Sequence, residues 1–273
     1  MSNDLDIPTL KWNLERVLGS PTLQLPTDAL VFDLETTGLS PATNKIWQIG
    51  LYPVKAGQAL YPEGENIYLN WPVAMLKAAD FEISRRRATA TTITNGESLD
   101  TRTRDGAYYK AEQGFIDEIQ GNGLDPREAL EAVVAIVNGY IERGCPLVGQ
   151  NVYHFDIGFM KHACQELGVP MFKYQQAKLV DTGMLIKAAK LQRRIAADES
   201  CFTFYDKISG IRAKGVYYAI EKYCIPRWNL DVKYGFDKSK AHAAGFDTMV
   251  TWYILKELVN EVLKEEVITN APS

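Results

Sequence analysis

The segment from Val31 to Gly38, which reads VFDLETTG, constrains this chain more than any other. An apolar run leads into it, and Asp33 and Glu35 stand two residues apart within it. Because successive side chains of a strand point to opposite faces, both carboxylates would share one face, with Cα atoms about 6.6–6.8 Å apart. Carboxylates this close repel each other, and the oxygen ligands they offer are those that Mg²⁺ and Mn²⁺ prefer. The segment therefore predicts half of a divalent-metal site.

Two acids farther along the chain are candidates for the other half of this site. Asp156 lies in the segment VGQNVYHFDIGFM (residues 148–160), and Asp247 lies in HAAGFDT (residues 242–248). Taken alone, an acid such as Asp156 at the start of a helix is more often explained by the helix dipole. His242, taken alone, is more often a surface histidine. Their significance therefore depends on the three segments being considered together.

In this order, the three segments resemble the three exonuclease motifs of the DnaQ-like 3′→5′ exonuclease superfamily, also called the DEDD family. A histidine five positions before the last Asp is typical of its DEDDh branch, and His242 fills that place. The sister branch would carry a tyrosine at position 243, where this chain has Ala. The resemblance extends from about residue 29 to about residue 262, and the family's four acids correspond to Asp33, Glu35, Asp156 and Asp247.

The resemblance implies a ribonuclease H-like fold and a metal-dependent 3′→5′ exonuclease that releases nucleoside 5′-monophosphates, with single-stranded DNA as the favoured substrate. The four acids would bind two divalent ions, Mg²⁺ or Mn²⁺, with Glu35 also counted among the catalytic residues. His242 would be the general base. The 3′-terminal nucleotide would contact the backbone amides of the turn Thr36, Thr37 and Gly38. Leu39 would be an apolar wedge against its base, and Asn151 would lie near the substrate.

Other functions remain open on the sequence alone. An exoribonuclease of the same superfamily that trims RNA 3′ ends would share the same acids, and its discrimination of the 2′-hydroxyl cannot be read from these motifs. A non-catalytic nucleic-acid-binding or polymerase-associated module is the alternative from a different class. Because no polymerase domain is evident in the sequence, proofreading beside a separate DNA polymerase, or work with other replication and repair proteins, is also possible.

The spacing of His242 and Asp247 predicts where each lies. Five residues of an ideal helix turn through about 500°, which is about 140° of net rotation, so the two side chains would not share a helix face. We therefore expect His242 on the loop before the final helix and Asp247 in the first turns of that helix. Asp181, which follows a short predicted strand, is a candidate N-cap of the next helix.

Composition limits the classes of function. The chain of 273 residues carries a net charge of −4, which argues against a protein that coats nucleic acid nonspecifically. Its 4 cysteines form no CxxC pair, so a zinc site is not expected, and reduced thiols in a cytoplasmic protein are the plain interpretation. The N-terminal residues show no apolar signal-peptide region, and no apolar run is long enough to span a membrane.

Hydrophobic periodicity predicts an α/β domain with a mixed sheet, in which an antiparallel meander and parallel strands are flanked by helices. Strands are expected over 29–34, 46–54, 66–71, 146–149 and 178–180. Helices are expected over 10–18, 126–143, 155–167 and 246–266, with a further helix opening at residues 181–182.

The predicted domain organisation is an N-terminal extension (1–28), an exonuclease domain (29–268) and a short tail (269–273). Two long polar segments, near 80–123 and 192–215, do not show clear periodicity and are interpreted as insertions into the domain. The first contains basic runs at Arg85–Arg87 and at Arg102 and Arg104. These could guide a phosphate backbone, or they could equally form a solvated loop face.

Overall fold

The computed structural model describes residues 4–20, 22–77, 116–212, 218–237 and 243–269. At its centre is one mixed sheet with strand order β3-β2-β1-β5-β6, and β4 pairs separately with β2. Strand β1 is antiparallel to β2 and parallel to β5, and β5 is parallel to β6. The strands are β1 (Ala29–Thr36), β2 (Ile46–Lys55), β3 (Gln58–Ala59), β4 (Glu65–Tyr68), β5 (Pro146–Gly149) and β6 (Lys178–Asp181).

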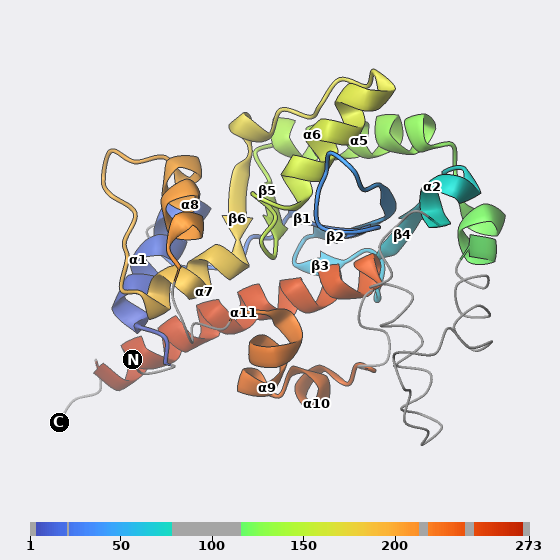
Figure 1. Ribbon diagram of the computed structural model, residues 1–273. Coiled ribbons are helices and arrows are strands. Elements are labelled where there is room, and N and C mark those ends of the chain that lie inside the picture. The colour runs from blue at the N-terminus through green and yellow to red at the C-terminus, as the bar shows by residue number, and fades with distance from the viewer. Residues whose placement is uncertain (1–3, 21, 78–115, 213–217, 238–242, 270–273) are drawn as a thin grey trace.

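Helices cover both faces of the sheet (Figure 1). Helix α5 (Pro126–Glu142) contacts β1 and β5 on one side, next to α6 (Asp156–Leu167). The long helix α11 (Ala244–Thr269) crosses the other side and contacts β1, β2, β4 and β5. This arrangement confirms the predicted fold class, a ribonuclease H-like α/β sheet with antiparallel and parallel strands flanked by helices. The remaining described helices include α2 (Val73–Lys77), α7 (Thr182–Lys190), α9 (Ile225–Trp228), α10 (Leu230–Tyr234) and the helical residues 116–122.

The strand expected over 66–71 corresponds to β4, which is shorter and pairs with Gln48–Leu51. It is preceded by the two-residue strand β3, which was not expected and pairs with the end of β2. The intervening residues 60–64 contain Pro62, which has no N–H to donate, and Gly64 at φ 77°. They form a turn that interrupts the pairing and brings Gly64 close to the start of α11.

The predicted N-terminal extension contributes to the same core as the rest of the chain. Helix α1 (Ile7–Leu18) begins after Asp6, whose side chain accepts a hydrogen bond from the Thr9 N–H at 2.9 Å. Leu10 and Leu14 of this helix are fully buried, and α1 contacts α7, α11 and β6. Residues 1–28 thus include a helix that packs against α7, α11 and β6 as part of the same hydrophobic core.

The segment expected as an insertion over 192–215 contains helix α8 (Cys201–Gly210). Ser200 caps this helix by accepting from the Thr203 N–H at 3.1 Å, and Phe204, Tyr205 and Ile208 are buried. The other expected insertion lies mostly in residues 78–115, so Arg85–Arg87, Arg102 and Arg104 fall outside the described residues. Across the described ranges, no helix is both long and apolar enough to cross a membrane.

Candidate active site

Three carboxylates converge where the end of β1 meets the start of α11. Asp33 and Glu35 project from the same face of β1, and Asp247 lies in the first turn of α11, where the sequence predicts it. One carboxylate oxygen from each residue lies within 4.8 Å of the other two. Within the described part of the chain, this is the one group of three or more His, Cys, Asp or Glu side chains that could hold a metal ion.

Asp156 lies beside this group, at the first residue of α6 and only 2% exposed. The backbone N–H groups of Leu34 and of Asp156 itself donate hydrogen bonds to its carboxylate. Its other oxygen, Oδ1, is buried and has no hydrogen-bond partner among the described residues. A buried carboxylate oxygen without a donor is costly, and a cation or a proton bound at this atom would relieve the cost.

The crowding of negative charge strongly perturbs the acids. Burial, followed by the charges of Asp156, Asp247 and Glu35, holds the pKa of Asp33 well above its usual range. Burial and the nearby charge of Asp181 also raise the pKa of Asp156, although the two backbone hydrogen bonds oppose this effect. These raised pKa values favour protonation of the carboxyls, and a bound cation would displace such protons.

A hard divalent cation fits the residues present here. All four side chains offer carboxylate oxygens, the donors that Mg²⁺ and Mn²⁺ prefer, and Asp156 Oδ1 is buried without a partner. No sulfur or imidazole ligand joins the described group, which is unlike the common zinc sites.

Asp181 holds in place the loop that carries Asp156. It caps α7 as predicted, by accepting from the Met184 N–H at 3.0 Å. It also accepts from the N–H groups of Asn151 at 3.0 Å and Tyr153 at 3.2 Å, which tie the loop after β5 to the end of β6. Burial raises the pKa of Asp181 to about 6, while these three N–H groups partly offset the increase.

The turn predicted to meet a nucleotide follows β1 directly. Thr37 pairs with Lys45 through two hydrogen bonds, each of 2.8 Å, and the Thr36 hydroxyl donates to the Gly38 carbonyl at 2.7 Å. A side chain at Gly38 would collide with Asn44, at 2.6 Å. Leu39 projects from this turn and is 83% exposed. The Thr37 N–H is therefore already satisfied within the protein, whereas the Leu39 side chain is available to solvent.

Two further residues were predicted for the site, Asn151 and His242. Asn151 adopts a left-handed conformation with φ 60°, and its buried Oδ1 faces Gly183, where a Cβ would lie 2.7 Å away. His242 lies outside the described residues, which resume at Ala243. Sequence reasoning overlooked Gln48 and Asn66, whose side chains bind the start of α11. The signal at Gln48 was a polar residue inside an otherwise apolar strand.

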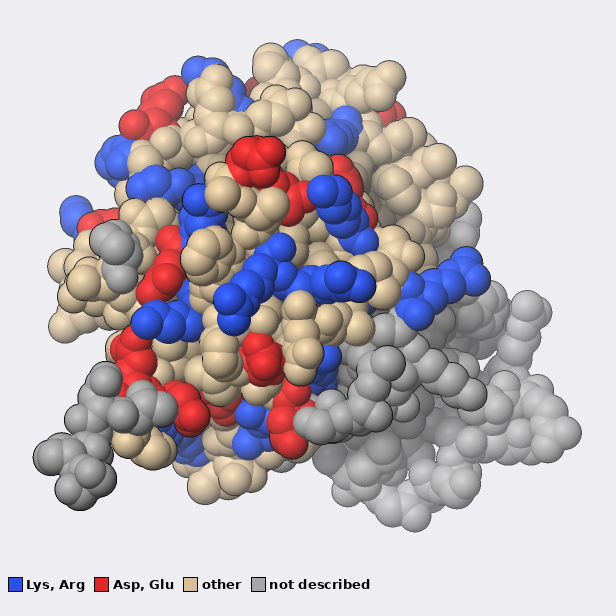
Figure 2. All heavy atoms as spheres, turned by 90° about the vertical axis from the view of Figure 1, so that its left-hand side faces the viewer, with Lys and Arg blue, Asp and Glu red and all other residues tan. Residues whose placement is uncertain are grey.

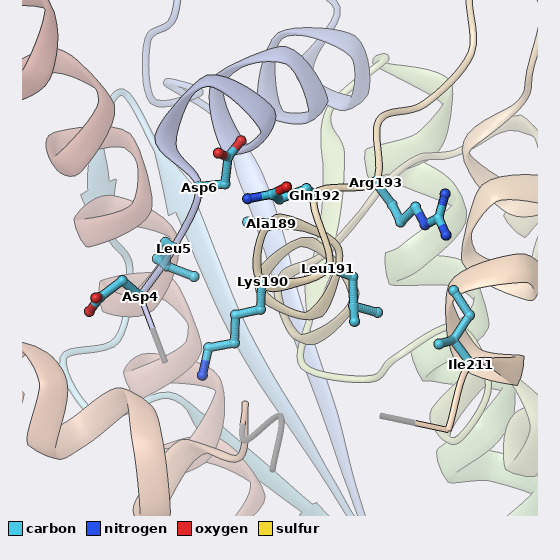
Figure 3. A pocket seen from close by; sticks show the side chains of 9 residues that line it. All are labelled: Asp4, Leu5, Asp6, Ala189, Lys190, Leu191, Gln192, Arg193 and Ile211. Atoms are coloured by element: carbon cyan, nitrogen blue, oxygen red, sulfur yellow. The ribbon is translucent and has the colours of Figure 1, made fainter. Parts of the chain in front are cut away.

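A cavity of about 540 Å³ lies elsewhere, between α1 and the end of α7 (Figure 3). It mixes the acids Asp4 and Asp6 with the bases Lys190 and Arg193. Burial, followed by the charge of Arg227, lowers the pKa of Lys190 to about 8. Figure 2 shows the face that carries α1, where Lys and Arg side chains form a band across the middle. Both features lie toward the C-terminal end of α11, whereas the carboxylate group lies at its beginning.

Comparisons with solved structures return exonuclease I repeatedly. A product-bound exonuclease I is 15% identical with a TM-score of 0.45, over 91% of this chain and 49% of that one. E. coli exonuclease I in complex with a dA16 oligonucleotide is 15% identical with a TM-score of 0.48, over 90% and 46%. The chain therefore spans about half the length of these proteins. No protein-family model matches the sequence, and no curated protein matches it.

At these identities and TM-scores, the account of the site depends on its own geometry. The mixed sheet of antiparallel and parallel strands, flanked by helices, agrees with the fold class expected from the sequence. The chain has the ribonuclease H-like fold, and the resemblance to the DnaQ-like 3′→5′ exonuclease superfamily rests on its three sequence motifs.

Proposed function

We propose that this chain is a metal-dependent 3′→5′ exonuclease that hydrolyses phosphodiester bonds and releases nucleoside 5′-monophosphates. One observation carries the proposal: acids from β1, the start of α6 and the start of α11 meet at one place. Three of their oxygens lie within 4.8 Å of one another, and a fourth acid has a buried oxygen without a partner. Such a cluster opposes folding unless a cation neutralises it, so it is better explained by chemistry than by stability.

In this proposal, Asp33, Glu35 and Asp247 hold one Mg²⁺ or Mn²⁺ ion, and Asp33 and Asp156 hold a second. When bound, such ions lower the pKa of a water molecule and offset the charge that develops on a phosphate group. His242 accepts the proton of the attacking water, which suits an imidazole with an unperturbed pKa near 6.5.

The turn after β1 is proposed to hold the 3′-terminal nucleotide. Leu39, exposed beside the two β1 acids, would pack against the terminal base. Backbone groups of Thr36, Thr37 and Gly38 would meet the sugar or phosphate, with Asn151 nearby. Because the Thr37 N–H is already bonded to Lys45, that contact would require the turn to rearrange or would use another group of Thr37.

Single-stranded DNA is the proposed substrate, and we further propose residues 29–268 as the exonuclease domain. Action beside a DNA polymerase or other replication and repair proteins remains a prediction, as does the cytoplasmic location. An exoribonuclease would use the same four acids, so the choice of nucleic acid must come from experiment.

The test is digestion of 5′-labelled single-stranded DNA, duplex DNA and RNA of one sequence, with Mg²⁺ or with EDTA, resolved by product length. We expect a ladder that shortens from the 3′ end on single-stranded DNA with Mg²⁺. Asp247→Ala should abolish the ladder and keep the wild-type circular dichroism, whereas Asp198→Asn, at an exposed acid away from the site, should leave it intact. Degradation that survives EDTA, or that persists in Asp247→Ala, would refute the mechanism. Faster digestion of RNA would transfer the proposal to an exoribonuclease.

A further inference from the structure

The start of α11 is capped by side chains of the sheet rather than by its own sequence. The first N–H groups of a helix have no partner within it and need acceptors from elsewhere. The Ala244 N–H donates to Gln48 Oε1 at 2.8 Å, and the Gly245 N–H donates to Asn66 Oδ1 at 2.7 Å. The preceding residue, Ala243, accepts the first helical hydrogen bond from Asp247, but its methyl group cannot cap.

Three glycines allow this close contact between helix and sheet. A Cβ at Gly50 would lie 2.2 Å from the carbonyl carbon of Ala244, and one at Gly64 would lie 2.3 Å from the carbonyl oxygen of Gly245. A Cβ at Gly245 would lie 2.9 Å from Asn66 Oδ1. At Gly50 and Gly64 the helix start therefore packs directly on the backbones of β2 and of the turn before β4, where a side chain would collide.

Gln48 is an unusual residue for its place in the core. It is fully buried in β2, between Trp47 and Ile49, which are also fully buried. Its Nε2 has no hydrogen-bond acceptor among the described residues. A buried amide with one unsatisfied group is a cost to the fold, and an apolar side chain of similar size would avoid it. What the amide contributes at this position is the acceptor for the Ala244 N–H.

The same stretch of β2 also holds the acids of β1. In the antiparallel register, Gln48 lies opposite Glu35, and Gly50 lies opposite Asp33. Asp247 follows Ala244 by one helical turn. Strand β2 thus connects the two β1 acids on one side with the α11 acid on the other, over three residues.

We infer that Gln48 and Asn66 are positioning residues that hold Asp247 at its distance from Asp33 and Glu35. They thereby set the affinity of the site for a divalent cation. This inference rests on the proposed function, because it takes the carboxylate group to be a metal site. Neither residue is expected to touch the substrate; each acts through the first turn of α11.

Two variants remove the two contacts, and two matched controls remove similar contacts elsewhere. Gln48→Met keeps the volume and removes both the cap and the unsatisfied Nε2, and Asn66→Ala removes the exposed cap. Asn13→Leu removes a buried amide that bonds Arg193 and Ile195, far along the chain from the acids. Asn138→Ala removes an acceptor for the Lys173 N–H, at 3.0 Å.

The measurements are the Mn²⁺ affinity of each full-length protein by isothermal titration calorimetry and its melting temperature in EDTA. We expect Gln48→Met and Asn66→Ala to weaken Mn²⁺ binding about 10- to 100-fold, as is typical for groups that orient metal ligands. Asn13→Leu and Asn138→Ala should keep the wild-type affinity even where their melting temperature falls. Asn66→Asp, which retains an oxygen that can cap a helix, should restore most of the affinity lost in Asn66→Ala.

The outcomes separate this inference from the proposed function. Wild-type Mn²⁺ affinity in both Gln48→Met and Asn66→Ala would overturn the inference alone. A wild-type protein that binds Mn²⁺ but leaves every nucleic acid intact would overturn the proposed nuclease activity. The positioning role would still be supported if the two variants bound Mn²⁺ weakly. A wild-type protein with no measurable Mn²⁺ affinity would overturn both.

Discussion

Replacing Asp33 by Asn should make the metal-free protein more stable at pH 8. Burial and the charges of Asp156, Asp247 and Glu35 raise the pKa of Asp33 in the folded protein. A carboxyl whose pKa rises on folding makes its full contribution to stability at pH values below its unfolded pKa. That contribution is lost as the pH rises through the folded pKa. Asn carries no charge at any pH, so the substitution removes the penalty that ionised Asp33 imposes at pH 8.

The size of this gain follows from the spacing of the acids. With oxygens no more than 4.8 Å apart, each fully ionised pair repels by at least about 3.5 kcal/mol at an effective dielectric constant of about 20. Proton uptake and partial exposure relieve much of this repulsion, so a net gain of about 2–3 kcal/mol is expected. For a chain of this size, that corresponds to about 4–12 °C in melting temperature.

Thermal unfolding followed by circular dichroism in EDTA, at pH 8 and at pH 4, measures the effect. Asp33→Asn should melt above the wild type at pH 8, and the difference should disappear near pH 4, where the wild-type carboxyl is protonated. Asp198→Asn, at an exposed acid, should shift neither value. Addition of Mn²⁺ at about 100 times its Kd should stabilise the wild type by about 2.7 kcal/mol and leave Asp33→Asn unchanged.

The reasoning would be refuted if Asp33→Asn lowered the melting temperature at pH 8 by as much as at pH 4. That result would mean that Asp33 makes favourable contacts in the metal-free protein and that the acids do not repel one another.

Three further predictions concern single residues. Asp181, with a pKa of about 6 when folded, should make stability fall by about 2 kcal/mol as the pH rises from 4 to 7; urea unfolding should show a smaller fall in Asp181→Asn, and an equal fall would contradict the assignment. His242→Ala should lower kcat about 10²- to 10⁴-fold at pH 7 without changing the Mn²⁺ affinity, and unchanged turnover would exclude it as the base. Leu39→Ala should raise KM for single-stranded DNA about fivefold, for a loss of about 1 kcal/mol of apolar contact; Val232→Ala, at another exposed apolar residue, should leave KM unchanged.

Local sequence patterns were sufficient for the parts of the site that depend on neighbouring residues. The period of two in β1 predicts that Asp33 and Glu35 share a face, and helical geometry predicts that Asp247 lies in the first turn of α11. Asp181 was recognised as an N-cap because that hydrogen bond joins residues three positions apart.

Contacts between distant segments could not be predicted in this way. Gln48 and Ala244 are 196 residues apart, and only the folded sheet reveals that one caps the other. The two loop contacts of Asp181 depend on β5 and β6 lying side by side. Strand β3 was missed because it has only 2 residues, too few to show a period of two in its hydrophobicity.

Anomalous diffraction from a crystal grown with Mn²⁺ tests most directly whether the four acids form a metal site. We predict peaks between Asp33, Glu35, Asp156 and Asp247. Asp156 Oδ1, which lacks a hydrogen-bond partner in the metal-free protein, should be bound to manganese. The central claim would be contradicted if, at saturating Mn²⁺, the four carboxylates were fully resolved and no anomalous peak lay among them.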